Sequence, residues 1–354
     1  MIVTGWQLST RALLPRPSLL SLVRLITIAV ITCSSTSLST ETERHYSSSN
    51  EAPSPPTTTT VRTTPTTPTP AAVIAPGVEK PLISLGTGGG MYGNRSVVEK
   101  AVFEWLQTDV GGRGIDTAID YDNEDLVGIA LARSGILRGE LFITTKQPGP
   151  IGFNETIAAL EGSLVRLQTS YVDLYLIHFP DPDDAPPGRS GKELRQETWR
   201  AMEEVLRRGW TRSIGVSNYK LSDLLDTLQV STVIPAVNQV LWNPASHDDA
   251  LLEFCQAKGI TLEAWSPLGG YDSRHGNVLD LPVMKRIAAS HGVSTAQVAL
   301  RWTLQHGMTL ATGTTTKDHM KTDLDVFGFR LTDEEVLAIT NIQNCGLSFA
   351  SECL

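Results

Sequence analysis

The chain has 354 residues, of which 41% are hydrophobic and 19% charged, a balance typical of a soluble globular protein. Residues 1–75 hold five arginines and three glutamates, which leaves 24 of the 29 basic and 35 of the 38 acidic side chains for residues 76–354. This acidic body argues against a nucleic-acid-binding groove, which needs a basic surface. The four cysteines form neither a CxxC nor a CxxH pattern, so we expect no structural metal site and no disulfide framework.

The first 75 residues differ in composition from the rest. Residues 1–40 contain no acidic residue, and the apolar run Leu25–Cys33 is followed by small hydroxyl residues, which resembles a signal peptide. An acid-free start with arginine and serine also suits an organelle transit peptide, so secretion, membrane anchoring and organelle import all stay open. Residues 41–75 form a Thr/Pro-rich linker that buries too little apolar surface to fold. We therefore expect one folded domain, 76–354, that is monomeric and that the leader could tether to a membrane.

From Leu82 onward, short apolar runs alternate with longer amphipathic segments. Eight runs predict β-strands, at 82–86, 114–118, 141–146, 172–178, 212–217, 236–240, 261–265 and 308–313. Short strands that are apolar on both faces and separated by helices predict a parallel sheet covered on both sides. Eight such units in about 250 residues predict an α/β fold of the (β/α)8 TIM barrel type. A threonine followed by acidic residues at the start of Leu331–Gln343 predicts an extra C-terminal helix.

One glycine-rich loop supports an alternative fold. Gly88, Gly90 and Gly93 spell GxGxxG between a predicted strand and a predicted helix, and Asp116 follows about 20 residues later. That pattern is typical of doubly wound dinucleotide-binding sheets. Such a sheet would not explain the later, evenly spaced units, so we favour a barrel with these glycines in a loop beside its mouth.

The carboxyl ends of the predicted strands carry unusual polar side chains. The active site of a TIM barrel lies at these ends, and here they offer Asp116, Tyr121, Lys146 and His178. A buried carboxylate is costly unless it is paired, so Asp116 predicts a partner, which Lys146 can supply. A lone histidine is more often a hydrogen-bonded core residue, and a lone lysine usually extends toward solvent. Their convergence from three successive strand ends nevertheless favours a shared site.

Together these four side chains predict a proton donor. A phenol has a pKa of about 10, which makes it a poor acid near neutral pH, and a neighbouring ammonium lowers that value. Asp116 would hold Lys146 charged, Lys146 would lower the pKa of Tyr121, and His178 would orient a carbonyl oxygen. Tyr121 could then protonate a developing alkoxide. Because the sequence offers no activated serine, Cys–His pair or metal cluster, this reaction needs a nicotinamide cofactor as its hydride source.

With these residues in place, the chain resembles the aldo-keto reductase superfamily over most of residues 79–343. The motifs GIDTAIDYDNEDLVGIAL, LFITTK, SLVRLQTSYVDLYLIHFP, RSIGVSNY, PAVNQV and LEAWSPLG follow the family's order. The resemblance implies a barrel that binds NADPH, with NADH as a possible alternative, and reduces a small-molecule carbonyl substrate. It implies catalytic roles for Asp116, Tyr121, Lys146 and His178, and substrate contacts from His178 and Phe179. Phe179 stands where the family commonly has tryptophan, so the substrate is not predicted.

The resemblance also implies a set of cofactor contacts. Ser217, Asn218 and Gln239 fall where the family binds the nicotinamide carboxamide, and Trp265 falls where an aromatic ring stacks on the nicotinamide. The full set of implied cofactor-binding residues is Thr87, Gly88, Ser217, Asn218, Gln239, Trp265, Ser266, Leu268, Gly313, Thr314, Thr315, His319 and Asp323.

The segment that would bind the 2′-phosphate, 312–323, departs from the family. Gly313 and His319 replace the lysine and arginine that bind this phosphate in many members. Threonines at a helix N-terminus offer another anion site, and Lys317 and Lys321 add charge. We expect NADPH to be preferred by a smaller margin than usual. The preference should grow as the pH falls, because an imidazole gains a proton.

Two other functions fit the same residues. The domain could be a cofactor-binding regulatory subunit of a membrane protein, as the family's potassium-channel partners are. It could also be a barrel aldolase with Lys146 as a Schiff-base nucleophile. Asp116 would keep Lys146 protonated, which is the wrong state for attack, so the reductase is favoured.

Overall fold

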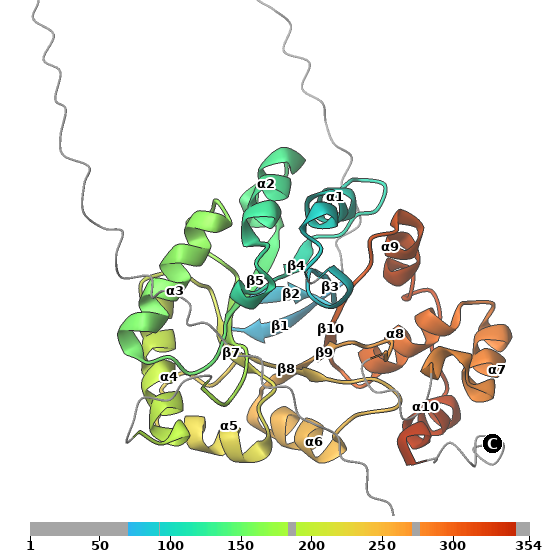
Figure 1. The fold of residues 1–354 in the computed structure, drawn as a ribbon. Coiled ribbons are helices and arrows are strands. Elements are labelled where there is room, and N and C mark those ends of the chain that lie inside the picture. Colours follow the sequence, from blue (N-terminus) through green and yellow to red (C-terminus); the bar gives the residue numbers. More distant parts are fainter. Residues whose placement is uncertain (1–69, 92, 183–188, 271–276, 345–354) are drawn as a thin grey trace, which may run out of the picture. The chain divides into compact units, whose positions relative to one another are not determined.

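The computed structural model describes residues 70–344 except 92, 183–188 and 271–276, so the expected leader and most of the expected linker lie outside the described residues. Eight parallel strands form a closed barrel in the order β10-β3-β4-β5-β6-β7-β8-β9 (Figure 1). Their bounds are β3 (Ile83–Gly86), β4 (Gly114–Asp116), β5 (Phe142–Gln147), β6 (Leu174–Ile177), β7 (Ile214–Ser217), β8 (Val237–Leu241), β9 (Thr261–Trp265) and β10 (Thr309–Thr312). Each lies within or overlaps one of the eight predicted runs, so the predicted (β/α)8 barrel is confirmed.

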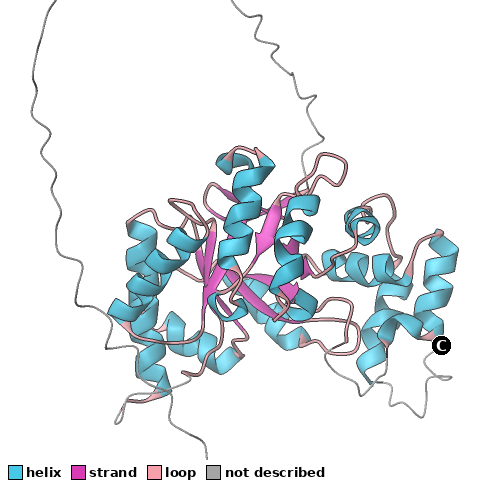
Figure 2. Ribbon diagram, turned by 45° about the horizontal axis from the view of Figure 1, so that its top comes forward, coloured by secondary structure: helices cyan, strands magenta, loops and turns pink. Residues whose placement is uncertain are grey.

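Helices surround the strands on the outside of the barrel (Figure 2). They are α1 (Arg95–Trp105), α2 (Glu124–Ser134), α3 (Phe153–Arg166), α4 (Gly191–Arg207), α5 (Leu221–Leu228), α6 (Asp249–Lys258), α7 (Pro282–His291), α8 (Thr295–Gln305), α9 (Lys317–Leu324) and α10 (Asp333–Thr340). The predicted extra helix is α10, and the side chains and backbone amides of Thr332 and Glu335 bond reciprocally at its start. No helix in the described part of the chain is long and apolar enough to cross a membrane.

The main hydrophobic core lies between the strands and the helices. Strand β6, with the sequence LYLI, is buried along its whole length, which explains its continuous apolar sequence. The largest side chains in this layer are four fully buried tryptophans, Trp105, Trp199, Trp242 and Trp302. Burial of large apolar surfaces of this kind is the main favourable contribution to folding.

A hairpin that the sequence did not predict packs at the amino-terminal end of the barrel. It consists of β1 (Ala71–Ala75) and β2 (Val78–Pro81), which pair antiparallel. Ile74 and Val78 pack against Phe142 and Leu174, the first residues of β5 and β6. The described residues therefore include a strand on the amino-terminal side of the expected boundary at Pro76. Composition could not show this, because the apolar stretch directly follows the Thr/Pro-rich run.

The glycine-rich loop follows β3 and contains the short 3-10 turn Gly89–Met91. Because the strands close into a barrel, the alternative of a doubly wound sheet is wrong. The loop lies at the carboxyl end of β3, beside the mouth of the barrel, as the favoured fold predicted.

A chain of charged and polar side chains runs through the interior of the barrel. Lys80 of the hairpin forms an ion pair with Glu263 of β9 at 2.6 Å, and both side chains are fully buried. Gln239 Nε2 donates to Glu263 Oε2 at 3.1 Å and to Asp116 Oδ2 at 2.7 Å. Asp116 in turn pairs with Lys146. We call these five residues the axial polar chain, which connects the hairpin to the opposite end of the barrel.

Candidate active site

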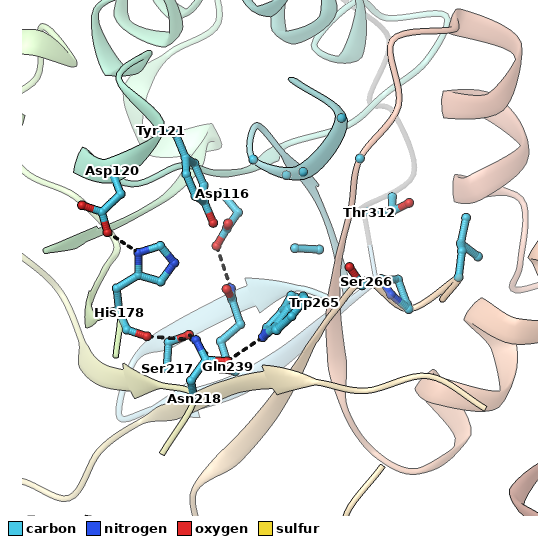
Figure 3. Close-up of a pocket in the computed structure, with 18 of the residues that line it drawn as sticks. Asp116, Asp120, Tyr121, His178, Ser217, Asn218, Gln239, Trp265, Ser266 and Thr312 are labelled. Atoms are coloured by element: carbon cyan, nitrogen blue, oxygen red, sulfur yellow. Dashed lines mark hydrogen bonds and ion pairs between the residues drawn. The ribbon is translucent and has the colours of Figure 1, made fainter. Parts of the chain in front are cut away.

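A cavity of about 640 Å³ opens at the carboxyl ends of the strands (Figure 3). Of the residues predicted to form the site, those that line it are Gly88, Asp116, Tyr121, His178, Phe179, Ser217, Asn218, Gln239, Trp265, Ser266, Leu268 and Gly313. The predicted residues that do not line it are Thr87, Lys146, Thr314, Thr315, His319 and Asp323. A concave site of this size is large enough for a cofactor and a small substrate.

Asp116, Lys146 and Tyr121 meet in one wall of the cavity. Asp116 ends β4, Lys146 lies in β5, and Tyr121 ends a 3-10 turn (Ile119–Tyr121) that follows β4. Lys146 Nζ lies 2.6 Å from Asp116 Oδ1 and 3.5 Å from the Tyr121 hydroxyl, and it donates to the Thr117 carbonyl at 3.0 Å. The expected pairing of Asp116 with Lys146 is therefore present. The ammonium is fully buried behind the phenol, which explains why it does not line the cavity.

The electrostatics of this wall differ from the expectation in one respect. Burial raises the pKa of Tyr121, and this effect outweighs the charge of Lys146, which lowers it. Burial lowers the pKa of Lys146, but Asp116, Tyr121 and Glu263 together outweigh it, so the pKa of Lys146 lies above its ordinary value. The prediction that the pKa of Tyr121 is lowered overall is thus wrong. Tyr121 stays protonated and Lys146 stays charged through neutral pH.

His178 follows β6 and faces the same cavity. Its Nδ1 lies 2.8 Å from Asp120 Oδ2, and its ring meets the Tyr121 ring edge-on with centroids 5.5 Å apart (Figure 3). Phe179 stacks on the imidazole with ring centroids 4.5 Å apart. Burial lowers the pKa of His178, and the hydrogen bond that His178 donates to Asp120 opposes this without reversing it. Sequence reasoning missed Asp120, although its position directly before Tyr121 was a signal.

Ser217, Asn218 and Trp265 form the opposite wall. Asn218 has a positive φ of 61°, a left-handed conformation that asparagine tolerates better than most residues. Its Nδ2 donates to the His178 carbonyl at 3.0 Å, and its Oδ1 accepts from Trp265 Nε1 at 2.9 Å. Ser217 Oγ donates to the Gln239 carbonyl at 2.8 Å. These bonds fix the indole of Trp265 at the edge of the cavity.

Gln239 has a role that the sequence did not predict. Its Nε2 donates to two carboxylates, those of Asp116 and Glu263, which accept but cannot donate. The amide is therefore oriented by the axial polar chain, and only its oxygen is left to accept a hydrogen bond from a ligand.

Of the residues predicted to bind the phosphate, Gly313 lines the cavity, whereas Thr314, Thr315, His319 and Asp323 do not. Lys317 Nζ and Lys321 Nζ lie 2.9 and 3.1 Å from Asp109 Oδ2, so both lysines are paired within the protein. Asp323 is buried and accepts from Thr312 Oγ1 at 3.1 Å, and burial raises its pKa to about 6. His319 is exposed. The charge that the two lysines could offer a phosphate is therefore reduced.

Comparisons with known proteins decide the family. Residues 83–344 match the model of the Aldo/keto reductase family. The chain belongs to this family. It is 40% identical over 263 residues to glyoxal reductase of Bacillus subtilis, covering 73% of this chain and 88% of that protein. It is 35% identical over 294 residues to D-galacturonate reductase of Fragaria ananassa, covering 77% of this chain and 89% of that protein.

A solved structure agrees. The aldo-keto reductase of Bombyx mori, determined in complex with NADP, superimposes with a TM-score of 0.72 at 33% identity. The match covers 80% of this chain and 95% of the silkworm chain. The barrel of this aldo/keto reductase is thus similar to one that binds a nicotinamide dinucleotide.

In this aldo/keto reductase, Gly88 and Thr87 follow β3 and support the cavity wall that contains Tyr121. A Cβ at Gly88 would lie 2.7 Å from the Tyr121 ring, so only glycine leaves room for the phenol in its present position. Thr87, which was expected to contact the cofactor, is instead fully buried, and its Oγ1 donates to Asn123 Oδ1 at 3.2 Å. Thr87 therefore holds the segment after β4 in place through its hydrogen bond to Asn123.

Proposed function

We propose that this protein reduces an aldehyde or ketone to an alcohol, with the proton supplied by Tyr121 and the hydride by NADPH. The observation that carries the proposal is the buried Asp116–Lys146 pair directly behind the Tyr121 hydroxyl in the cavity wall. No other arrangement among the cavity-lining residues combines a protonated acid with a fixed neighbouring positive charge.

Tyr121 can donate its proton because the phenolate that remains is stabilised. As the proton leaves, negative charge develops on the phenol oxygen, and Lys146 Nζ lies 3.5 Å away to stabilise it. Asp116 keeps that ammonium in place and charged. The same contact argues against an aldolase, because a Schiff-base lysine must lose its proton and the pKa of Lys146 is raised.

The cavity fits a nicotinamide cofactor. It extends from Tyr121 to Gly313 and includes Ser217, Asn218 and Trp265 in one wall. Trp265 would contact the planar ring, and the Ser217–Asn218 side chains and the oxygen of Gln239 would bind the polar group attached to it. A bound nicotinamide cofactor would supply the hydride. The silkworm structure in complex with NADP supports this assignment.

The activities of two relatives support a small carbonyl substrate. The Bacillus protein is a glyoxal reductase and the Fragaria protein is a D-galacturonate reductase. A suitable first experiment uses the full chain and follows NADPH oxidation with glyoxal, galacturonate and 4-nitrobenzaldehyde, against a control without carbonyl compound. NADPH binding without turnover on any of them would instead favour a cofactor-binding regulatory subunit.

We expect only a modest preference for NADPH over NADH. Lys317 and Lys321 are engaged by Asp109, which leaves His319 as the residue at the position where many members have arginine. Replacing His319 by arginine should raise the NADPH-to-NADH affinity ratio about tenfold, because a guanidinium binds phosphate through two charged hydrogen bonds. Fluorescence titration with both cofactors measures the ratio.

Lys317→Ala gives a control for this prediction. Lys317 is already paired with Asp109, so its removal should change the NADPH-to-NADH affinity ratio less than His319→Arg does. Equal affinities for both cofactors in every variant would show that this segment does not recognise the phosphate.

A further inference from the structure

The hydrogen bond between Asp120 and His178 has a consequence for catalysis. Asp120 lies directly before Tyr121 in the same 3-10 turn, and its side chain is 33% exposed at the cavity edge. Its Oδ2 is 2.8 Å from His178 Nδ1, and the other ring nitrogen, Nε2, points away from Asp120 toward the cavity (Figure 3). An ionised carboxylate can only accept a hydrogen bond, so Nδ1 must carry the hydrogen.

The hydrogen on Nδ1 determines whether Nε2 can donate a hydrogen bond. A neutral imidazole carries one N–H, so a neutral His178 bonded to Asp120 presents a bare Nε2 to the cavity. A bare nitrogen cannot donate a hydrogen bond to a carbonyl oxygen. Nε2 becomes a donor only when the ring takes up a second proton.

We propose that Asp120 is a positioning residue that fixes the tautomer of His178, so that His178 assists carbonyl reduction only in its protonated form. The inference rests on the proposed function, because it concerns the carbonyl oxygen that Tyr121 protonates. Asp120 acts through His178 and not on the substrate directly.

The charged groups around His178 set the pH at which its ring takes up the second proton. Asp120 and Tyr121 face the ring from the 3-10 turn, Asp116 acts from β4 and Lys146 from β5. Burial and the charge of Lys146 lower the pKa of His178, and together they outweigh the two carboxylates, which raise it. The ring is therefore mostly neutral at pH 7, and reduction should accelerate as the pH falls below about 6.5. Tyr121 stays protonated across this range, because burial raises its pKa.

Asp120→Asn tests the proposal. An asparagine can donate to Nδ1 through its amide nitrogen, which leaves the hydrogen on Nε2 in the neutral ring. The unmodified protein should gain about tenfold in kcat/KM for a neutral aldehyde from pH 8 to pH 5.5, as expected for one added charged hydrogen bond. The variant should show a nearly flat profile that meets or exceeds the unmodified protein at pH 8.

Asp122→Asn is the matched control. Asp122 lies two residues further on, and its side chain is 91% exposed beside Arg95. Asparagine tolerates its left-handed φ of 49°. This variant removes the same charge without a contact to His178 and should keep the pH profile of the unmodified protein.

A second readout does not depend on turnover. Nitrogen-15 NMR of the histidine side chains at pH 8 should show His178 as the Nδ1–H tautomer, and Asp120→Asn should populate the Nε2–H tautomer. An Nε2–H tautomer in the unmodified protein would overturn the proposal. So would an Asp120→Asn profile that is lowered equally at every pH, which indicates a purely structural role. Absence of NADPH-dependent reduction in the unmodified protein would instead contradict the proposed function.

Discussion

Tyr121→Phe is expected to lower kcat for carbonyl reduction by about 10²–10⁴-fold, the usual contribution of a positioned general acid. The substitution removes the one hydroxyl that both lines the cavity and lies 3.5 Å from the buried ammonium of Lys146. It keeps the aromatic ring that packs near Gly88 and His178. NADPH affinity, measured by fluorescence titration, should therefore change little while turnover is lost.

Tyr219→Phe provides the matched control. Tyr219 is fully buried, and its hydroxyl has no hydrogen-bond partner among the described residues. Removing that hydroxyl leaves no other polar group unpaired, so activity and stability should both be retained. Activity of Tyr121→Phe within a few-fold of the unmodified protein would rule out Tyr121 as the proton donor.

Lys80→Met is expected to destabilise the protein by about 3–5 kcal/mol, although it lies at the end of the barrel opposite the cavity. It removes the partner of Glu263 and leaves a fully buried carboxylate without its 2.6 Å ion pair. Adding Glu263→Gln should recover most of the loss, because a neutral amide can still accept from Gln239. Urea unfolding followed by circular dichroism measures both variants.

An exposed ion pair serves as the comparison. Lys285 lies 3.5 Å from Asp280, and their side chains are 60% and 68% exposed. Lys285→Met should change stability little, because solvent screens such pairs. If Lys80→Met were no more destabilising than Lys285→Met, the axial polar chain would not contribute to the stability of the barrel.

The barrel was predictable because its signals are local. Each buried strand is a short apolar run, and α10 is preceded by an N-cap threonine, Thr332, with glutamate three residues later. The hairpin was not predictable, because its strands are defined by tertiary packing of Ile74 and Val78 against the ends of distant strands. Propensity and periodicity cannot reveal a contact of that kind.

The candidate site was predictable where burial forces a pairing. Asp116 had to have a partner, and Lys146 was the nearest strand-end cation. Asp120 was missed because it is one of several acids around Tyr121, and only the structure shows which one reaches His178. The direction of the pKa shift of Tyr121 was predicted wrongly, because the sequence showed the neighbouring charge but not the depth of burial.

Transfer of deuterium tests the central claim most directly. NADPH carrying deuterium at both C4 positions is incubated with the full chain and 4-nitrobenzaldehyde, and the product is analysed by mass spectrometry. We expect one deuterium on the former carbonyl carbon of the alcohol for each NADPH consumed, and no labelled alcohol above background with Tyr121→Phe. Alcohol formed without deuterium, or labelled alcohol formed equally well by Tyr121→Phe, would contradict the account.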